Sequence, residues 1–332
     1  MKKTLLITGW TWYIGSHAVV AFEQAWYKTV LIDNLVNSSK NTLKNIGEIL
    51  WYTPDFFEWD LRDKDFLEQV FSKYSFDWVL HFAWLKAVWE STQKPLEYFD
   101  NNIVGSLRLF EVMEKFSVKK IIFSSSATVY NFDNQIPYME NQNLWDTTNT
   151  YATTKYLIEK ILNDLSKFSW FNVINLRYFN PIWAHSSWLI WENPEWIPNN
   201  LLPFIMKVAL WQLPYVNVFG DDYDTPDGSW VRDYIDIEDL IDGHLKAYQL
   251  LENLDFVWFI DDFNLWSWKG ISVFQIIDAS KKIIGKEIPF QVVWRRSWDI
   301  GEFYCNPTKA KNILDWQPKK TLEESLEKSF RL

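Results

Sequence analysis

The chain has 332 residues, enough for a large core and for two domains, or for one domain with a sizeable appendage. Its 33 Lys and Arg against 43 Asp and Glu give a net charge of −10, with no long basic run, which argues against nucleic acid and anionic membranes as partners. The single cysteine, Cys305, rules out an internal disulfide and fits a reducing cytosol. The opening MKKTLLITG has too short an apolar run for a signal peptide, so we expect a cytoplasmic protein.

The first half of the chain alternates short β-branched runs with longer amphipathic segments. We predict strands at 4–8, 29–33, 78–83, 120–126 and 171–176, and helices at 15–25, 63–73, 95–116 and 151–168. This alternation predicts an α/β fold with a doubly wound parallel sheet. From about residue 180, frequent prolines break the rhythm, and we expect a smaller C-terminal α+β substrate domain there.

Tryptophan is unusually frequent and glycine unusually rare. There are 22 Trp and 10 Gly, whereas average usage of roughly 7% predicts more than twice as many glycines. Trp26 and Trp170 each fall between a helical run and a strand, where a left-handed residue, usually glycine, is expected. A side chain makes that backbone conformation costly. We therefore hypothesise that many tryptophans occupy glycine positions.

The first strand, turn and helix favour nucleotide binding. The strand runs into Gly9, and Gly15 leads into the helix, so that the backbone between them can lie close to a phosphate. Asp33 ends the second strand, where an acid accepts hydrogen bonds from the adenosine ribose and repels a 2′-phosphate. The pattern favours NAD over NADP, although an ordinary βαβ unit of another α/β protein has the same spacing.

Longer motifs carry a resemblance. TGWTWYIGSH resembles the TGxxGxxG turn of extended short-chain dehydrogenases, with Trp12 on its middle glycine and Trp10 on a commonly glycine position. Nine further motifs follow in the order of the UDP-glucose 4-epimerase family, along nearly the whole chain. They are LIDNLVNSS, DLRD, HFAWLKAV, DNNIVGSLRL, SSSATVY, RYFNP, IPNNLLPFI, VFGDDYDTPDGSWVRDYI and RRSWDI. The resemblance implies an NAD-binding Rossmann-type domain over 1–179, completed by part of 234–265, a UDP-sugar-binding domain over 180–332, and a homodimer.

Two Tyr-x-x-x-Lys pairs are candidates for acid–base chemistry: Tyr151/Lys155 and Tyr156/Lys160. Residues i and i+4 share a helix face, so either pair can bring a phenol to an ammonium, which favours phenolate. Tyr156 belongs to an apolar row and Lys160 to a solvated surface, whereas Tyr151 begins the helix downstream of the strand ending in SSS. We favour Tyr151/Lys155.

The resemblance implies the reaction as well. Ser126 matches the family's catalytic serine, although a strand-end serine alone more often bonds only to backbone. Tyr151 takes the proton from the sugar 4-hydroxyl while hydride passes from C4 to NAD. The 4-keto sugar then turns over in the site and receives hydride on its opposite face, which interconverts UDP-galactose and UDP-glucose without net redox change.

Further family positions carry over by resemblance. For NAD they are Gly9, Trp12, Tyr13, Ile14, Gly15, Asp33, Asn34, Asn37, Ser38, Asp60, Leu61, Phe82, Ala83, Lys86, Asn101, Tyr151, Lys155 and Phe179. For the UDP-sugar they are Ser126, Asn180, Asn200, Leu201, Asn217, Phe219, Arg232, Arg296, Asp299 and Phe303. Arg232 and Arg296 suit a diphosphate, which guanidinium binds in a bidentate fork, while ordinary surface ion pairing is the competing interpretation. Bulk at Phe303 implies restriction to sugars without an N-acetyl group.

Three alternatives compete with this prediction. Sister dehydratases place an acid pair after the catalytic hydroxyl residue, whereas Ala127 and Thr128 stand there. The four scattered histidines and lone cysteine show no metal-binding spacing, so we expect no metal. A catalytically impaired sugar-nucleotide-binding homologue is the other class, because Trp10, Trp12 and Trp84 obstruct the predicted NAD site. An epimerase acting on another UDP-sugar is the third.

Overall fold

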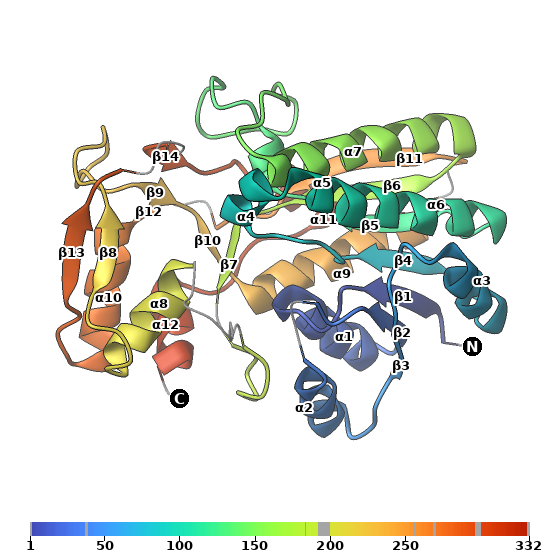
Figure 1. The fold of residues 1–332 in the computed structure, drawn as a ribbon, viewed down its shortest axis with the longest axis horizontal. Helices are drawn as coiled ribbons and strands as arrows, with labels where there is room; N and C mark the ends of the chain where they lie inside the picture. Colours follow the sequence, from blue (N-terminus) through green and yellow to red (C-terminus); the bar gives the residue numbers. More distant parts are fainter. Residues whose placement is uncertain are drawn as a thin grey trace.

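A seven-stranded parallel sheet forms the centre of the computed structural model, which describes residues 2–36, 39–182, 184–191, 200–254, 257–267, 270–295 and 300–330. The strand order is β11-β6-β5-β4-β1-β2-β3 (Figure 1). The strands are β1 (Thr4–Thr8), β2 (Lys28–Asp33), β3 (Asp55–Glu58), β4 (Trp78–His81), β5 (Lys120–Ser124), β6 (Asn172–Arg177) and β11 (Phe259–Asn264). The predicted doubly wound parallel sheet is confirmed.

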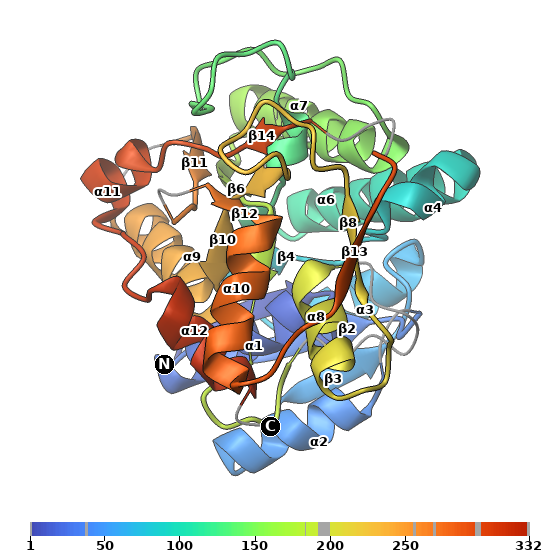
Figure 2. The same cartoon turned by 90° about the vertical axis from the view of Figure 1, so that its left-hand side faces the viewer.

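Helices cover both faces of this sheet (Figures 1 and 2). One face carries α1 (Tyr13–Gln24), α2 (Asn41–Leu50), α9 (Ile237–Asn253) and α11 (Thr308–Leu314). The other carries α3 (Lys64–Lys73), α4 (Val88–Gln93), α5 (Pro95–Phe99), the π-turn η1 (Asp100–Val104), α6 (Gly105–Lys115) and α7 (Thr150–Ser169), with the short 3₁₀ turn η2 (Ala127–Val129) after β5. The two layers place the strands between two separate apolar cores.

Strand alternation accounts for the two cores. Leu5 and Ile7 of β1 pack among residues of α1 and α9, whereas Leu6 packs among residues of α3, α6 and α7. Successive side chains of a strand point to opposite faces, so an unbroken apolar run is what a strand covered on both faces requires. All three leucine and isoleucine side chains are fully buried.

The C-terminal part forms a smaller α+β body beside the carboxyl ends of the sheet strands (Figure 1). Its elements are β7 (Asn180–Ile182), α8 (Leu201–Ala209), β8 (Val216–Phe219), β9 (Val231–Arg232), β10 (Tyr234–Asp236), β12 (Ile271–Ser272), α10 (Val273–Ile284), β13 (Phe290–Val293), β14 (Glu302–Phe303) and α12 (Leu322–Phe330). A third apolar cluster, which includes Ile205 of α8, Ile276 of α10 and Leu326 of α12, holds it together. Among the described residues, no helix is both long and apolar enough to cross a membrane.

Several element boundaries differ from the predictions. The strands predicted to end at residues 83 and 126 end at His81 and Ser124, because the chain leaves the sheet there to form the loops of the carboxyl edge. Edge strand β3 was not predicted, since its DFFE sequence is only partly buried and lacks an alternating pattern. Helix α2 was also missed, and Gly47 near its middle weakens its helical signal.

The helix predicted over 95–116 is interrupted. It consists of α5, the π-turn η1 and α6 in continuous succession. A π-turn accommodates one residue more than an α-turn and frequently occurs at functional sites. Inside it, the buried Asn102 amide accepts a hydrogen bond from the Leu85 N–H at 2.9 Å and donates one to the Leu85 carbonyl at 3.1 Å. This side chain ties the loop after β4 to the helix.

Tryptophan occupies most of the left-handed backbone positions that are not glycine, among the described residues. Among the described residues, ten non-glycine residues have positive φ, and six of these are tryptophans. They are Trp26, Trp51, Trp145, Trp170, Trp188 and Trp211. Trp51 and Trp170 are the C-caps of α2 and α7, with φ of 64° and 58°. An L-residue with a Cβ is strained in this region, whereas glycine is not.

We expect that replacing Trp170 with glycine raises the free energy of unfolding by about 1 kcal/mol. The indole is 61% exposed, so little packing is lost when the strained Cβ is removed. Urea-induced unfolding measures the change. Trp316→Ala is the control: its buried indole donates to the Asp239 carbonyl at 2.9 Å, and we expect a loss of about 3–5 kcal/mol. A Trp170→Gly protein less stable than the parent contradicts the strain argument.

Candidate active site

The turn after β1 requires glycine at two positions. Gly9 has φ of 69°, and a Cβ built on it lies 2.4 Å from the Ala83 backbone after β4. A Cβ on Gly15 lies 2.4 Å from the Gly9 carbonyl oxygen. Trp12 is the N-cap of α1, and its side chain makes no capping hydrogen bond. The turn after β1 therefore packs against the residues that follow β4, and the first turn of α1 packs against that turn, with its backbone N–H groups at the carboxyl edge of the sheet.

Acidic residues follow the next two strands. Asp33, the last residue of β2, accepts hydrogen bonds from the Thr11 N–H at 3.1 Å and the Leu35 N–H at 2.8 Å. Burial raises the pKa of this carboxyl despite those bonds. Asp60 follows β3 and accepts from Asn34 at 3.0 Å. Hydrogen bonds from Arg62 lower the pKa of Asp60 to about 2, so this group is a permanent carboxylate at neutral pH.

A buried histidine bridges the floor of the site. The Ser106 hydroxyl donates to the Asn102 carbonyl at 2.6 Å, so His81 Nε2–H donates to Ser106 (2.8 Å). His81 Nδ1 then accepts from the Thr8 hydroxyl at 2.7 Å. Burial, and secondarily the charge of Lys155, lower the pKa of His81 from 6.5 to about 3. The imidazole is neutral and links β1, β4 and α6.

A cleft of about 700 Å³, its open mouth included, lies between the ends of these strands. Ten residues predicted to bind NAD line it: Gly9, Trp12, Asp33, Asn34, Asp60, Leu61, Phe82, Ala83, Lys86 and Asn101. Its other lining residues were not assigned to the site from the sequence: Ile32, Val36, Trp59, His81, Trp84, Leu85 and Ser106. In a doubly wound sheet, ligands bind where the strand order reverses, as it does here between β1 and β4. Four of the residues that were not assigned follow β2, β3 or β4 closely, and that position is the sequence signal that could have identified them: Val36, Trp59, Trp84 and Leu85.

Other residues predicted to bind NAD lie elsewhere. Tyr13, Ile14 and Gly15 are buried in the first turn of α1 and do not line the cleft. Phe179 packs against Phe303, with ring centroids 5.2 Å apart. Asn37, Ser38, Arg296 and Asp299 lie outside the described residues.

The favoured catalytic residues meet at the end of β5. Ser126 caps η2, and its side chain accepts hydrogen bonds from the Thr128 N–H at 3.3 Å and the Thr128 hydroxyl at 3.0 Å. Tyr151, in the first turn of α7, shares a side-chain hydrogen bond with Ser126, while burial raises the pKa of the Tyr151 phenol to about 12. Lys155 Nζ donates to the Ser124 carbonyl at 2.5 Å and lies 6.0 Å from the centre of the Tyr151 ring.

The second Tyr-x-x-x-Lys pair faces another way. Lys160 is exposed, and Tyr156 packs on Trp145 with ring centroids 4.9 Å apart. Lys155, one helical turn earlier, is 3% exposed, and burial lowers its pKa well below the ordinary value. The structure thus brings Tyr151 and Lys155 together with Ser126 and leaves Tyr156 and Lys160 on the outer surface of α7.

Two tryptophans cover cations of the site. The Lys155 ammonium lies 3.9 Å from the centre of the Trp84 ring, and the Lys86 ammonium lies 3.3 Å from the Trp12 ring. Trp10 does not obstruct the cleft, contrary to the prediction. It is fully buried under Phe56, with ring centroids 4.9 Å apart, because its side chain points into the core.

The residues predicted to bind a UDP-sugar are spread over the smaller body. Arg232 is buried and donates to the carbonyls of Val231 and Ile300, both at 2.9 Å. It pairs in register with Phe303 on β14, whose ring is buried. Asn180 donates to the Asp233 carbonyl at 3.2 Å, and Asn217 accepts from Gln291 at 2.8 Å. The remaining three lie at helix and strand ends: Asn200, Leu201 and Phe219.

No group of three or more His, Cys, Asp or Glu side chains within the described ranges is arranged to hold a metal ion. The single cysteine, Cys305, is buried in the cluster around Phe303.

Comparison with known proteins places the whole chain in one family. The family model described as GDP-mannose 4,6 dehydratase matches residues 6–329. The UDP-glucose 4-epimerase of Neisseria meningitidis serogroup C is 45% identical, and the alignment covers 100% of this chain and 97% of that protein. The UDP-glucose 4-epimerase of Bacillus subtilis strain 168 is 44% identical, with 98% of this chain and 96% of that protein covered.

Solved structures show the same relationship. UDP-glucose 4-epimerase from Stenotrophomonas maltophila, with bound NAD and formylated UDP-arabinopyranose, superposes with a TM-score of 0.95 at 38% identity, covering 99% of this chain and 97% of that one. The Bifidobacterium longum enzyme, in complex with NAD+ and UDP, has a TM-score of 0.92 at 40% identity, covering 98% and 96% of the two chains.

The buried neutral His81 is expected to make the fold sensitive to acid. Its folded pKa of about 3 lies below the unfolded value of 6.5, so its contribution to stability is complete above pH 6.5 and is lost as the pH falls. The loss is about 1.4 kcal/mol for each pH unit between those values. Urea unfolding of the His81→Gln protein is expected to show a pH slope shallower by that amount. His185→Gln, at a half-buried imidazole, is the control and changes the slope less; equal slopes for His81→Gln and the parent contradict the assignment.

Proposed function

This chain belongs to the UDP-glucose 4-epimerase family, and from that premise we propose that it interconverts UDP-galactose and UDP-glucose with NAD as its resident cofactor. The names of the relatives favour the active enzyme over an impaired binding homologue. One observation carries the proposal. Tyr151, Lys155 and Ser126 meet at the carboxyl edge of the sheet, beside the glycine turn and the acidic cleft.

The fit of NAD to this site is supported on the adenosine side. The turn at Gly9 has no room for a Cβ, which is the feature of a backbone that approaches a pyrophosphate closely. Asp33 and Asp60 offer carboxylate oxygens at the edge of the cleft, and Asp33 suits ribose hydroxyls. Trp12 and Trp84 also line the cleft and take up space there against Lys86 and Lys155.

Bound NAD supplies a hydride acceptor and carries positive charge on its nicotinamide ring. The chain's own residues manage the proton. With a pKa of about 12, the buried Tyr151 phenol is protonated at neutral pH and needs positive charge nearby to act as a base. The Lys155 ammonium supplies such charge, and Ser126 holds the phenol by its hydrogen bond. Tyr151 in this state takes the proton of the sugar 4-hydroxyl and returns it after the sugar turns over.

The smaller body is proposed to bind the UDP-sugar. Arg232 is held by two carbonyls beside β14, which orients its guanidinium for a diphosphate. Phe303 is 2% exposed, with its ring 4.9 Å from that of Tyr138 and 5.2 Å from that of Phe179. A ring fixed in this way leaves no room for repacking around a bulky sugar substituent, which supports restriction to UDP-glucose and UDP-galactose.

We also propose a cytoplasmic homodimer. The buried, single Cys305 is compatible with a reducing compartment, and the homodimer is the expectation of the family resemblance. Light scattering of the purified protein tests the oligomeric state.

The Tyr151→Phe protein is expected to lose turnover of UDP-galactose by at least about 100-fold, because the ring packing remains while the proton-transferring hydroxyl is gone. Tyr156→Phe, one turn away on the outer surface of α7, is the matched control and keeps its turnover. Bound NAD, released by denaturation and assayed, reports that the site is intact in both. Unchanged turnover in Tyr151→Phe removes this residue as the base, and an NAD-free, inactive parent protein favours the impaired homologue.

A further inference from the structure

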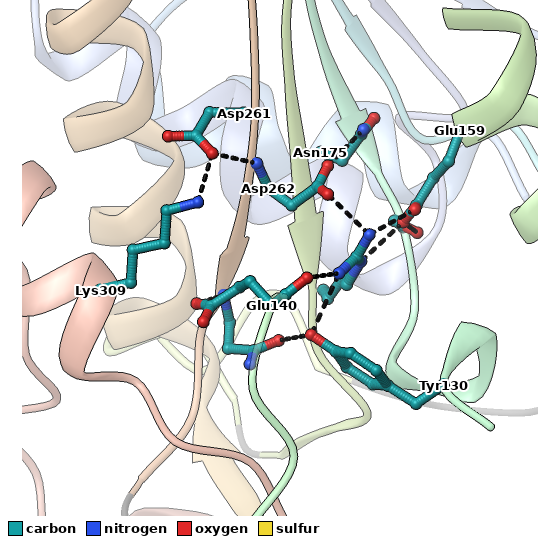
Figure 3. Close-up of polar contacts among 10 residues, drawn as sticks. Tyr130, Glu140, Glu159, Asn175, Asp261, Asp262 and Lys309 are labelled. Atoms are coloured by element: carbon teal, nitrogen blue, oxygen red, sulfur yellow. Dashed lines mark hydrogen bonds and ion pairs between the residues drawn. The ribbon is translucent and has the colours of Figure 1, made fainter. Parts of the chain in front are cut away.

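A fully buried ion pair joins the catalytic helix to the central sheet. Arg177, the last residue of β6, donates from Nε and from a terminal nitrogen to the two carboxylate oxygens of Glu159 on α7, at 2.9 and 2.6 Å. The side chains are 0% and 4% exposed. Figure 3 shows Glu159, Asp262 and Tyr130 directed toward this guanidinium from three different segments.

The remaining polar atoms of the guanidinium are satisfied. It donates to the Asp262 carboxylate on β11 at 2.8 Å and to the Tyr130 hydroxyl at 3.1 Å. The Tyr130 hydroxyl in turn donates to the Asn264 side chain at 2.7 Å. Removing a charged pair from water costs several kcal/mol for each ion, so a buried pair is not by itself a source of stability. Its position suggests that it serves the site.

The pair holds the strand end that carries the catalytic serine. The Ser125 hydroxyl donates to Glu159 Oε1 at 2.5 Å. Its neighbours Ser124 and Ser126 contact Lys155 and Tyr151 respectively. Since Tyr151, Lys155 and Glu159 are spaced by four residues, they share one face of α7. Ser124, Ser125 and Ser126 are thereby each held by a residue of α7, from three successive turns of that helix.

Glu159 is also the anion nearest along the helix to Lys155. Burial lowers the pKa of Lys155, and the charge of Glu159 opposes that shift. From β4, His81 faces the ammonium and is neutral, and Tyr178 at the end of β6 interacts with Tyr151. On its other side Glu159 faces Arg177 and Asp262, and Arg177 in turn contacts Tyr130, near which Glu140 and Cys305 lie. These are the titratable groups from each element packed around the pair.

We propose that Glu159 is a positioning residue for the proposed epimerase reaction: it fixes Ser126 through Ser125, and its charge favours the ammonium form of Lys155 beside Tyr151. The residue touches neither substrate nor cofactor and acts through its neighbours. The inference rests on the proposed function, because the proton that Lys155 controls is the one that Tyr151 exchanges with the sugar.

The Glu159→Gln holoenzyme tests the charge, since the amide oxygen can still accept from Ser125. Without the anion Lys155 loses its proton more easily, the Tyr151 phenolate is less favoured, and the acid limb of the kcat–pH profile moves upward. A shift of about one pH unit corresponds to a tenfold lower kcat below the limb. Asp262→Asn removes one negative charge from the same guanidinium without touching Ser125, and it is expected to leave the limb in place.

Ser125→Ala tests the positional link without altering charge, and is expected to lower kcat severalfold with an unchanged acid limb and KM. The proposal is overturned if Glu159→Gln lowers the melting temperature but leaves the acid limb in place, or if Asp262→Asn shifts the acid limb equally. It is also overturned if Ser125→Ala has the kcat of the parent. Failure of the parent protein to turn over UDP-galactose refutes the proposed function instead, and is therefore distinguishable.

A second inference comes from the tryptophans and does not depend on catalysis. Four of those in left-handed conformation are more than 60% exposed: Trp26, Trp51, Trp170 and Trp211, at 77%, 93%, 61% and 77%. Each bears the strain of positive φ without burying its indole. At such positions a residue without a Cβ is favoured, and a large side chain gains no packing.

The tryptophans whose indole Nε1 is buried fall into two kinds. Trp266 and Trp316 each donate Nε1–H to a carbonyl, that of Arg177 at 3.0 Å and that of Asp239 at 2.9 Å. Trp10, Trp84 and Trp230 bury Nε1 without a partner among the described residues. Buried polar groups are normally paired, so these three indoles do not match their surroundings.

We infer that the enzyme made in its own cells carries glycine, not tryptophan, at the positions of Trp12, Trp26, Trp51, Trp84, Trp170 and Trp211. A codon with the meaning tryptophan in one genetic code and glycine in another produces this pattern, because it affects some tryptophans and spares others such as Trp316. At the cofactor cleft the exchange removes the indoles that cover Lys86 and Lys155. It resolves the misfit of NAD to that part of the cleft.

Peptide mass spectrometry of the protein purified from its native cells tests this inference directly. We expect the peptides spanning Trp12 and Trp170 to have the mass for glycine, and the peptide spanning Trp316 to have the mass for tryptophan. In recombinant protein, we expect the Trp12→Gly, Trp84→Gly double variant to bind NAD at least about tenfold more tightly in titration calorimetry. Tryptophan at positions 12 and 170 in the native protein, or equal NAD affinity of the two recombinant proteins, overturns the inference.

Discussion

The backbone of Gly9 lies against the backbone of Ala83, and no side chain fits between them. This contact joins the turn after β1 to the residue that follows β4, at the point where the strand order reverses. The cleft, the acids that line it and the bridging His81 all take their positions from that approach. A side chain at Gly9 would push the ends of β1 and β4 apart. It would also move the N-terminus of α1 away from the acids that line the cleft.

The opposite side of the same edge is fixed by charge. Lys155 and Glu159 point from α7 toward the ends of β5 and β6. Lys155 donates to the Ser124 carbonyl, and Glu159 accepts from the Ser125 hydroxyl and the Arg177 guanidinium. Close backbone packing sets the geometry of the proposed cofactor side, and a buried ionic cluster sets that of the proton-transfer side. The two sides of one sheet edge are therefore held by different interactions. The first is sensitive to added side-chain volume, and the second is sensitive to loss of charge.

The sequence was sufficient to predict the doubly wound sheet because its strands are long apolar runs separated by amphipathic helices. It also separated Lys155 from Lys160, since the apolar row around Tyr156 belongs to a different helix face. The individual binding residues carried over from the family stay predictions. The contacts of Arg177 with Glu159 and Asp262 were not predictable, because they join residues from three elements through side-chain geometry.

The orientation of the aromatic side chains was the other limit. Trp10 and Trp12 stand two residues apart in one turn, yet the first is buried in the core and the second faces the cleft. Spacing alone marked both as obstructions. The difference depends on the direction of each Cβ in a turn whose backbone is set by Gly9 and Gly15.

The π-turn before α6 has a consequence for the evolution of the chain's length. One residue added to an ordinary α-helix turns everything after it by about 100° about the axis, and the wider π-turn absorbs such a residue so that α6 keeps its rotational phase. Without the wider turn, Leu109 and Met113 would leave the core, and Ser106 would leave His81. A second insertion in α6 would have no wide turn to absorb it, so we expect this segment to tolerate a substitution at an exposed position such as Asp100 better than a further insertion. In related proteins, we expect the number of residues in the segment from α5 to α6 to vary less than the identity of those residues.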